Sequence, residues 1–432
     1  GGDSILSIQI ASRARAQNIS LSVADIFNFS TVAVLAEQLV HKQPQRKQVE
    51  PQQSFSGALP LLPIQHWFFE QQFVAADHWN QSLLLSVDKT VTVQHIKELT
   101  CALLAHHDSL RLVVDDKGLQ KQFFIKQHLS ADHVCHFIDL AEHNDDWSQA
   151  LEKVCEVQQG AFRFDGTALL QICHIKTPAQ QSDNRLLIIA HHLLIDGVSW
   201  RILLEDINQA LSAAKLQQNI CFASRTANLY DISQFLIAQG KDEYDLKHWQ
   251  ALVAVASKPS FFRFVRQQEL IKKQLQQHTL TLPCAATQQL LTTANRPYNT
   301  SIQTLLLAAL QWSAVRHYDL DDHLIVLEGH GRELLNNQLD STRTLGWLTA
   351  MYPFRLFSNT QNIADLICDM KEQLANLSTK ASRYGALRYY HPDEKTRQSL
   401  TITTENHLFF NYLGQLDSAL QHNGLLDDAP ES

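Results

Sequence analysis

Apolar residues in the region 59–432 recur with two different spacings, and each spacing predicts a different kind of element. Short apolar runs predict β-strands at 81–87, 185–190 and 324–331. Apolar residues three and four positions apart predict amphipathic helices at 95–107 and 198–211. In the second helix this apolar stripe consists of Trp200, Leu203, Leu204, Ile207 and Leu211. Mixed strands and helices of this kind indicate an α/β fold.

The first 58 residues have a different character. Helical spacing of apolar residues and the N-cap pair Ser30-Thr31 predict a small all-helical unit. It is followed by a stretch rich in Gln, Pro and Lys without periodicity, which is typical of a linker. After residue 58, a polar segment near 213–230 gives a weak indication of a boundary between two lobes. We therefore predict a helical unit at 1–40, a linker at 41–58, a first lobe at 59–225 and a second lobe at 226–432.

Composition narrows the class of protein. The 432 residues include 36 Lys and Arg against 44 Asp and Glu, a net charge of −8, which argues against nucleic acid or an anionic membrane as the main partner. The sequence contains no apolar stretch of the roughly 20 residues that span a bilayer, and the first residues do not resemble a signal peptide. Seven widely spaced cysteines without a CxxC pair predict reduced thiols in a cytoplasmic protein, without a zinc site.

Two adjacent histidines follow the strand predicted at 185–190, in the sequence HHLLIDGVSW. Successive strand residues point to opposite faces, so His191 and His192 cannot both reach one ligand, and a two-histidine metal site is not expected. One imidazole can face a cavity while the other points into the scaffold; the alternative is a pair of satisfied core histidines. The turn at Asp196-Gly197 leads into the next helix, and the Asp196 carboxylate is placed to hold that turn or a loop arginine.

A carboxylate also ends an apolar strand, at Glu328 in the sequence EGHGRE. Glycines at 329 and 331 permit a tight turn and the close approach of a substrate. Burial would raise the pKa of Glu328, which suits proton transfer, whereas the alternative is a surface turn. Tyr412 in FNYLGQ is either a phenolic proton donor or a packed ring. A second histidine pair, in HHDSLR at 106–111, lacks the DG turn and is expected to be scaffold.

HHLLIDG resembles the HHxxxDG motif of the condensation-domain superfamily of nonribosomal peptide synthetases, which includes condensation, cyclisation and epimerisation domains. PIQHWFFE resembles the family's opening segment. EGHGRE resembles an epimerisation signature that ordinary condensation domains lack, and RTLGWLTAMYPFRL, YGALRYY and FNYLGQ resemble the epimerisation motifs that follow it. The matches occur in family order over residues 59 to about 417. HHxxxDG alone leaves the reaction open, whereas the ordered set favours epimerisation.

The resemblance implies an α/β fold of two chloramphenicol-acetyltransferase-like lobes in a V, with a channel between them that the second histidine faces. It implies that the catalytic residues are His192, Glu328 and Tyr412. It assigns structural roles within the motifs to His191, Asp196, Gly197, Arg332, Arg343 and Asn411. We expect the two arginines to anchor loops through ion pairs, with Asp196 as a candidate partner.

The sequence GGDSILS resembles the phosphopantetheine attachment sequence of carrier proteins, and 21–39 is similar to the rest of such a carrier. Ser4 would hold covalent 4′-phosphopantetheine, since it opens a helix whose free N–H groups and dipole favour a phosphodiester. An N-capped helix after a glycine turn is the alternative. Family carriers have a further helix before the serine, and epimerisation domains continue past FNYLGQ. We therefore expect the carrier to be N-terminally incomplete and the second lobe C-terminally incomplete.

The predicted function is epimerisation, from L to D at Cα, of an aminoacyl or peptidyl thioester held on a carrier. The expected partners are the carrier-bound substrate and neighbouring synthetase domains, adenylation upstream and condensation downstream, with no nucleic acid, membrane or metal. One alternative is a condensation domain that forms peptide bonds through His192, which leaves EGHGRE and FNYLGQ unexplained. The other is a non-catalytic recruitment platform, which should have lost the catalytic histidine or glutamate; both are present.

Overall fold

A computed structural model describes most of the chain between residues 54 and 431. The described ranges are 31–41, 54–116, 121–143, 146–254, 277–332, 339–358, 360–377, 380–402, 408–414 and 426–431, with Leu335 and scattered positions between 7 and 29. Ser4 and the helix expected around it lie outside the described residues. The predicted helix after Ser30-Thr31 is confirmed as α3, Val32–His41.

The chain divides into two compact units. The histidine unit comprises Ile8–Phe235, Leu335–Thr349 and Leu413–Ser432. The glutamate unit comprises Gly1–Ser7, Leu236–Leu334 and Ala350–Tyr412. This division by contacts differs from the single boundary predicted after residue 225. The main division lies ten residues later, and the chain returns twice to the histidine unit, because contacts over long sequence separations decide which segments pack together.

The histidine unit is built on a five-stranded sheet in the order β11-β2-β7-β6-β5. Its strands are β2 Asn80–Val87, β5 Cys135–Asp139, β6 Leu170–Lys176, β7 Asn184–His191 and β11 Leu426–Asp428. Strand β5 runs parallel to β6, and the other pairings are antiparallel. All eight residues of β7 are buried, which is why the run from Leu186 to Ala190 is continuously apolar rather than alternating. The strands predicted at 81–87 and 185–190 are both confirmed.

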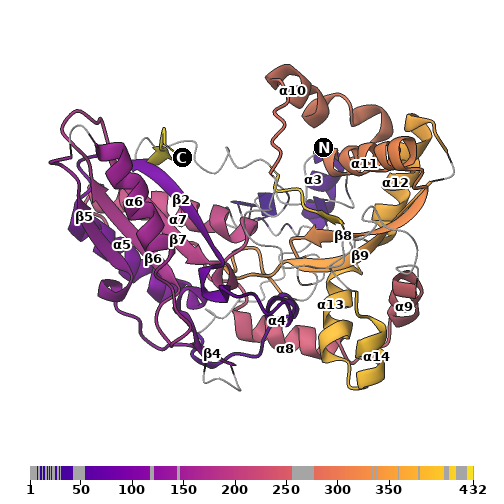
Figure 1. Cartoon of the computed structure of the whole chain (residues 1–432), viewed down its shortest axis with the longest axis horizontal. Coiled ribbons are helices and arrows are strands. Elements are labelled where there is room, and N and C mark those ends of the chain that lie inside the picture. The colour runs from indigo at the N-terminus through magenta and orange to yellow at the C-terminus, as the bar shows by residue number, and fades with distance from the viewer. Residues whose placement is uncertain are drawn as a thin grey trace. The chain divides into compact units, whose positions relative to one another are not determined.

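The helices of the histidine unit are α4 Pro63–Glu70, α5 Val93–His106, α6 Trp147–Gln159, α7 Gly197–Lys215 and the first part of α8 Leu229–Gln239. Helix α5 contacts β5, β6 and α7, and α6 contacts β7 (Figure 1). Helices α5 and α7 confirm the predictions at 95–107 and 198–211, and the apolar stripe of α7 is buried. Short 3₁₀ turns lie at Ala76–His78, Asp108–Arg111, Ala131–His133 and His192–Leu194.

A second, small sheet corrects the predicted linker. It has the order β1-β4-β3, with bounds Gly57–Ala58, Lys121–Ile125 and Leu112–Asp116. The side chain of Ser54 and the backbone N–H of Phe55 each donate a 2.7 Å hydrogen bond to the Asp108 carboxylate. Residues 54–58 therefore belong to the folded histidine unit and not to the linker. The periodicity of so short a strand is too brief to register in the sequence.

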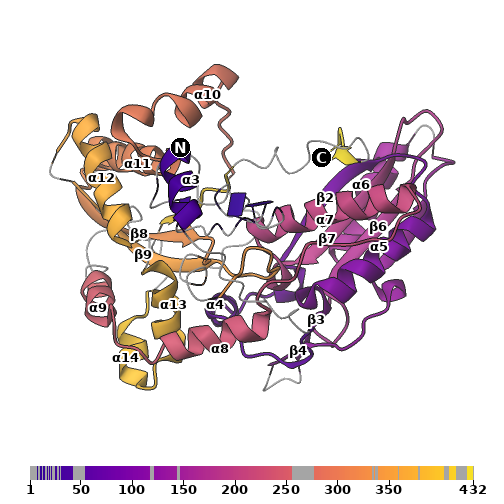
Figure 2. The same ribbon diagram turned by 180° about the vertical axis from the view of Figure 1, so that it is seen from behind.

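The glutamate unit is built on a three-stranded sheet in the order β10-β8-β9. The strands are β8 Asp322–Gly329, β9 Ala350–Phe357 and β10 Leu408–Phe410, and β8 confirms the strand predicted at 324–331. The helices are α9 Leu246–Ala254, α10 Cys284–Thr292, α11 Ile302–Tyr318, α12 Ile363–Leu377, α13 Ala381–Tyr390 and α14 Glu394–Ser399, with a 3₁₀ turn at Arg296–Tyr298. Helices α11 and α12 lie on one side of the sheet and α13 on the other (Figure 2).

Side chains from all three layers form the core of the glutamate unit, including Trp249, Phe354 and Met370. Helix α13 and helix α9 both pack against β9. The buried sheet thus gives Glu328, at the end of β8, a rigid support. Within the described residues, no helix has the length and apolarity needed to cross a membrane.

Candidate active site

The turn after β7 is held by its own polar side chains. The backbone N–H of His192 donates to the Trp79 carbonyl at 2.9 Å. Asp196 is the N-cap of α7, and its carboxylate accepts the Ser199 N–H at 2.8 Å and the Ser199 hydroxyl at 2.7 Å. Such a cap satisfies helix N–H groups that have no partner within the helix. The motif spacing therefore places a rigid turn directly after a buried strand.

His191 points into the interior of the histidine unit and is fully buried. Its Nε2 lies 2.8 Å from the Ala76 carbonyl oxygen, and its Nδ1 accepts the Leu193 N–H at 3.1 Å. Phe68 and Phe164 surround the ring, with centroid distances of 5.9 and 5.2 Å. Burial lowers the pKa of His191 to about 4. With both nitrogens engaged in the scaffold, His191 has no ring nitrogen left for a substrate.

His192 has a different environment. It is only half-buried, and the ring of Trp347 covers its imidazole with a centroid distance of 4.2 Å and an interplanar angle of 34°. Its Nδ1 is buried and has no hydrogen-bond partner in the described part of the chain, which leaves Nε2 as the nitrogen to meet a substrate. Burial lowers the pKa of His192, and the surrounding backbone and the Asp196 carboxylate oppose this only in part. A neutral imidazole can accept a proton.

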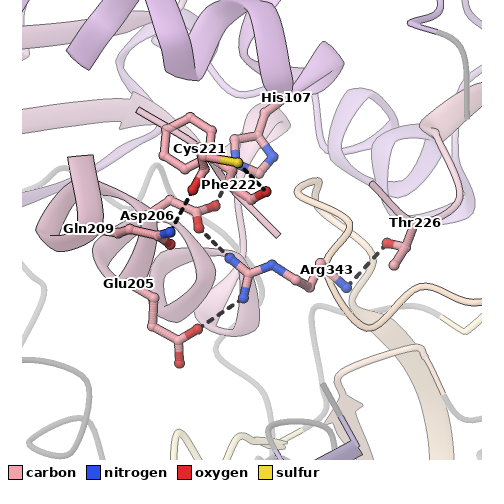
Figure 3. Close-up of polar contacts among 8 residues, drawn as sticks. All are labelled: His107, Glu205, Asp206, Gln209, Cys221, Phe222, Thr226 and Arg343. Atoms are coloured by element: carbon pink, nitrogen blue, oxygen red, sulfur yellow. Dashed lines mark hydrogen bonds and ion pairs between the residues drawn. The ribbon is translucent and has the colours of Figure 1, made fainter. Parts of the chain in front are cut away.

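The residues 339–349, named here the GWLT segment, lie against the turn. The second oxygen of the Asp196 carboxylate accepts the Leu348 N–H at 3.1 Å. The sequence suggested Asp196 as the partner of Arg343, but the two do not pair. The Arg343 guanidinium instead bonds Glu205 at 3.0 Å and also Asp206 (Figure 3). Asp196 is occupied by backbone and hydroxyl donors, whereas the two acids of α7 face the arginine. Arg343 does anchor a loop, but to a helix.

The second histidine pair belongs to the scaffold, as the sequence indicated. His107 is buried, and its Nε2 lies 2.8 Å from the second carboxylate oxygen of Asp206 (Figure 3). Asp108 and Arg111, from the same HHDSLR segment, form a buried ion pair of 2.7 Å. Both contacts hold structural elements together, and the ring of His106 is half-buried.

Glu328 is the carboxylate of the glutamate unit and is half-buried. Because β10 pairs in parallel with β8, with Phe410 opposite Leu327, the next residue Asn411 lies beside Glu328. The Asn411 amide donates a 2.8 Å hydrogen bond to Oε2 of Glu328. Burial raises the pKa of Glu328. This carboxyl group can therefore exchange a proton closer to neutral pH than an exposed one can.

The residues around Glu328 shape the turn. Gly331 has φ +69°, a left-handed conformation that a side chain would strain. Arg332 is fully buried and donates to the His330 carbonyl at 3.0 Å, so it anchors the turn locally. Tyr412 is half-buried and follows Asn411 directly. Its catalytic role stays a prediction.

Comparison with known proteins decides the family. The family model for the condensation domain matches residues 56–427, and that for the phosphopantetheine attachment site matches residues 1–39. The chain belongs to the condensation-domain family. The first match begins at residue 56 and supports placing residues 54–58 in the domain. The α/β fold inferred from the sequence is confirmed.

The curated relatives of this condensation-family chain are antibiotic synthetases. It is 31% identical to gramicidin S synthase 1 of Brevibacillus brevis, over 97% of the chain and 38% of the relative. It is also 31% identical to tyrocidine synthase 2 of Brevibacillus parabrevis, over 97% of the chain and 12% of the relative. The chain thus spans well under half the length of these two relatives.

Solved structures give the same fold. The epimerization domain from the third module of tyrocidine synthetase B is similar with a TM-score of 0.77 and 27% identity, covering 88% of this chain and 85% of that one. The first condensation domain of the calcium-dependent antibiotic synthetase matches with a TM-score of 0.60 and 16% identity, covering 83% and 80%. The second likeness supports the fold alone.

The match at residues 1–39 identifies 4′-phosphopantetheine as the covalent cofactor. A serine hydroxyl has the chemistry needed for a phosphodiester, and Ser4 stands in the attachment sequence. Its surroundings lie outside the described residues, so its assignment rests on the sequence. Among the described residues, no cluster of three or more His, Cys, Asp or Glu side chains could hold a metal ion.

Three residues of the condensation-family site were not singled out from the sequence. Gln65 is fully buried in α4, where its side chain accepts the Leu62 N–H at 2.9 Å and donates to the Leu193 carbonyl at 3.3 Å. Phe68 contacts the rings of both His191 and Trp347. The motifs PIQHWFFE and RTLGWLTAMYPFRL contain these residues, but only the contacts show that both motifs support one turn.

Proposed function

We propose that this condensation-family chain epimerises an amino acid at Cα while the amino acid is held as a thioester on a carrier domain. The observation that carries the proposal is Glu328. Its carboxyl group ends a buried strand, its pKa is raised by burial, and an amide donor beside it orients it. Formation of a peptide bond from a thioester and an amine does not require this second proton-transfer group.

The tyrocidine synthetase domain to which the chain is similar is itself an epimerization domain, and this likeness supports the proposal. The EGHGRE and FNYLGQ segments, which resemble epimerisation motifs, contain Glu328 and Asn411, and these two side chains are hydrogen-bonded. Two segments 83 residues apart thus contribute to one carboxylate. That contact gives a physical reason for both motifs.

The chemistry needs one proton acceptor and one proton donor at the same carbon. A thioester acidifies the Cα–H bond, since the electron pair left on Cα delocalises into the carbonyl as an enolate. Burial favours the neutral form of both groups, an imidazole that accepts a proton at His192 and a carboxyl that donates one at Glu328. Transfer of one proton to His192 and one from Glu328 to the opposite face of Cα inverts the centre.

One inversion leaves His192 as imidazolium and Glu328 as carboxylate. Either the reverse reaction or proton exchange with water restores the two neutral groups. Solvent hydrogen should therefore enter Cα. The assignment of the two residues to the L and D faces stays open. The phosphopantetheine thiol, when present on Ser4, holds the substrate acyl group as the thioester, and the chain around residues 41–53 keeps the local substrate concentration high.

The test uses the full chain, loaded at Ser4 by a phosphopantetheinyl transferase from aminoacyl-coenzyme A. A panel of aromatic, aliphatic and polar amino acids is needed, in L and in D form, without an acceptor amine. In deuterated water, chiral analysis of the hydrolysed product should show the same mixture from both enantiomers, near parity, with deuterium at Cα. His192→Ala, loaded in the same way, measures uncatalysed exchange.

If every enantiomer stays as loaded, the epimerase proposal fails. Consumption of the thioester only after an acceptor amine is added would then assign the chain to peptide-bond formation. Ser4→Ala should abolish loading, seen as loss of a single mass adduct. An adduct that persists in that variant would refute Ser4 as the attachment residue.

A further inference from the structure

The indole of Trp347 packs against the imidazole of His192. Trp347 is 4% exposed, and its ring lies over the imidazole at 4.2 Å rather than edge-on. The edge of Phe68 supports the indole at 5.9 Å with an interplanar angle of 71°. Water is thereby kept from one face of the imidazole. Nδ1 of the same ring is buried as well.

The GWLT segment that carries Trp347 is neither helix nor strand over 339–349, so its position depends on specific bonds. The Ser199 hydroxyl lies 3.0 Å from both the N–H and the carbonyl of Gly346. Gly346 has φ +156°, and a Cβ there would lie 2.5 Å from a methyl carbon of Leu229. Ser199 and Asp196 therefore fix Trp347 and His192 relative to the same turn.

Arg343 holds the other end of the segment (Figure 3). Its side chain is 10% exposed and bridges two acids of α7: Glu205, which is 34% exposed, and Asp206, which is 1% exposed. The second oxygen of Asp206 is bonded to His107 at 2.8 Å. A buried charge that bonds on both sides has little freedom to move.

Packing and polar contacts both hold the segment. Leu345, Trp347 and Leu348 are buried. Residues 343–345 also line a pocket that is partly open to solvent, together with residues 106–109 and 225–229. At this pocket the ion pairs of Arg343 are joined by two hydrogen bonds, from the Arg343 N–H to the Thr226 hydroxyl at 3.2 Å and from the Thr344 hydroxyl to the Ala227 carbonyl at 2.6 Å.

We propose that the GWLT segment is a positioning element for His192, in which Trp347 fixes the ring and excludes water from one face, while the Arg343–Asp206–His107 network holds the segment in place. Trp347, Arg343 and Asp206 are thus positioning residues. The catalytic meaning of this element rests on the proposed function, whereas its effect on the His192 ring does not. The charged or titratable groups that act on this ring are Asp196 and the neighbouring His191.

The experiment measures the effect of the segment on the His192 ring separately from its effect on catalysis. Histidine-labelled full chain is titrated by NMR, with the His192 signal assigned by its loss in His192→Gln. In Trp347→Ala the pKa of His192 should move up toward the ordinary histidine value, because water regains access to the ring. In the loaded chain, the same substitution should lower kcat about 10–100-fold with little change in KM, since it disturbs orientation and not substrate binding.

Conservative variants keep the test decisive if the alanine variant does not fold. Trp347→Phe and Arg343→Lys should shift the His192 titration and kcat in the same direction, each by about 3–10-fold in kcat. Glu205→Gln, on the more exposed acid, should have a smaller effect than Asp206→Asn. The control is Trp147→Phe, since Trp147 contacts Arg185, seven residues before His192 and roughly 20 Å away along the strand direction.

The inference is overturned if folded Trp347→Phe and Arg343→Lys leave the His192 titration and kcat unchanged, or if Trp147→Phe changes them equally. A fall in the pKa of His192 in Trp347→Ala would contradict the exclusion of water, because it would mean that the indole face stabilises the imidazolium. A chain without epimerase activity whose His192 titration still responds to Trp347 would refute the proposed function and retain the positioning element.

Discussion

His192 and Glu328 are the two ionisable groups proposed for proton transfer, and their supports differ sharply. His192 follows a fully buried strand and is held by a capped turn, an aromatic ring and a loop that is itself fixed by buried ion pairs. Glu328 ends a strand, and within the described residues its carboxylate is oriented by the amide of one exposed residue, Asn411. Burial nevertheless shifts both toward the neutral form.

The comparison shows that the orientation of a proton-transfer group and its proton affinity are set by separate means. Burial alone is sufficient to shift a pKa, since it disfavours any charged form. A fixed direction of approach needs several bonds from more than one element, as at His192. Glu328, with fewer bonds, is better able to adjust its position. Substitutions on the two sides can break or sharpen this contrast, beginning with the largest effect.

Removing either group tests whether the two are equal partners. His192→Ala and Glu328→Gln should each lower the rate of epimerisation by about 10²–10⁴, the usual range for a positioned acid or base. Exchange of Cα deuterium in loaded chain measures the loss. If one substitution leaves the rate unchanged in a folded chain, that residue is not a proton-transfer group and the two cannot be compared as partners.

Removing the central support of the His192 turn should destabilise the histidine unit. Asp196→Ala removes the cap of α7 and the acceptor of the Leu348 N–H, leaving buried donors unsatisfied, and should lower the free energy of unfolding by about 2–4 kcal/mol. Urea unfolding followed by tryptophan fluorescence measures it. Asn411→Ala, on the Glu328 side, is the matched control and should change stability by less than about 0.5 kcal/mol.

The neutral scaffold histidine predicts a pH dependence of stability. The pKa of His191 is about 4 in the folded chain against about 6.5 when unfolded, so its contribution is complete above pH 6.5 and is lost as the pH falls toward 4. Between pH 7 and pH 5 the loss is about 2 kcal/mol. His191→Gln should show a shallower pH dependence than the native chain. Parallel curves for the two proteins would contradict a buried neutral His191.

The smallest effect is expected at the single bond to Glu328. Asn411→Ala removes a hydrogen bond that favours the charged carboxylate, so the pKa of Glu328 should rise further. The rate should fall by about 3–10-fold, with the Glu328 limb of the pH–rate profile moved to higher pH. Asn411→Asp, which places a second carboxylate there, should move that limb further in the same direction. A shift to lower pH in either variant would refute this bond as a support of the carboxylate.

The sequence by itself was sufficient for most of the local elements and for the family. The stripe from Trp200 to Leu211 predicted α7, and the apolar run before His191 predicted β7, because periodicity records which face of an element is buried. The order of motifs predicted the family, and the HHxxxDG spacing pointed to a turn held by Asp196. These features depend on neighbours along the chain.

Tertiary structure decided which distant segments meet. Nothing in the spacing of residues indicates that Trp347 covers His192, that Arg343 bonds Asp206 instead of Asp196, or that Asn411 bonds Glu328. Residues 54–58 looked like linker, and contacts divide the chain after residue 235 rather than 225, because neither a two-residue strand nor the contacts of a loop leave a period in the sequence. Such contacts arise from sheet register and from the packing of whole elements, which join residues that are far apart in the sequence.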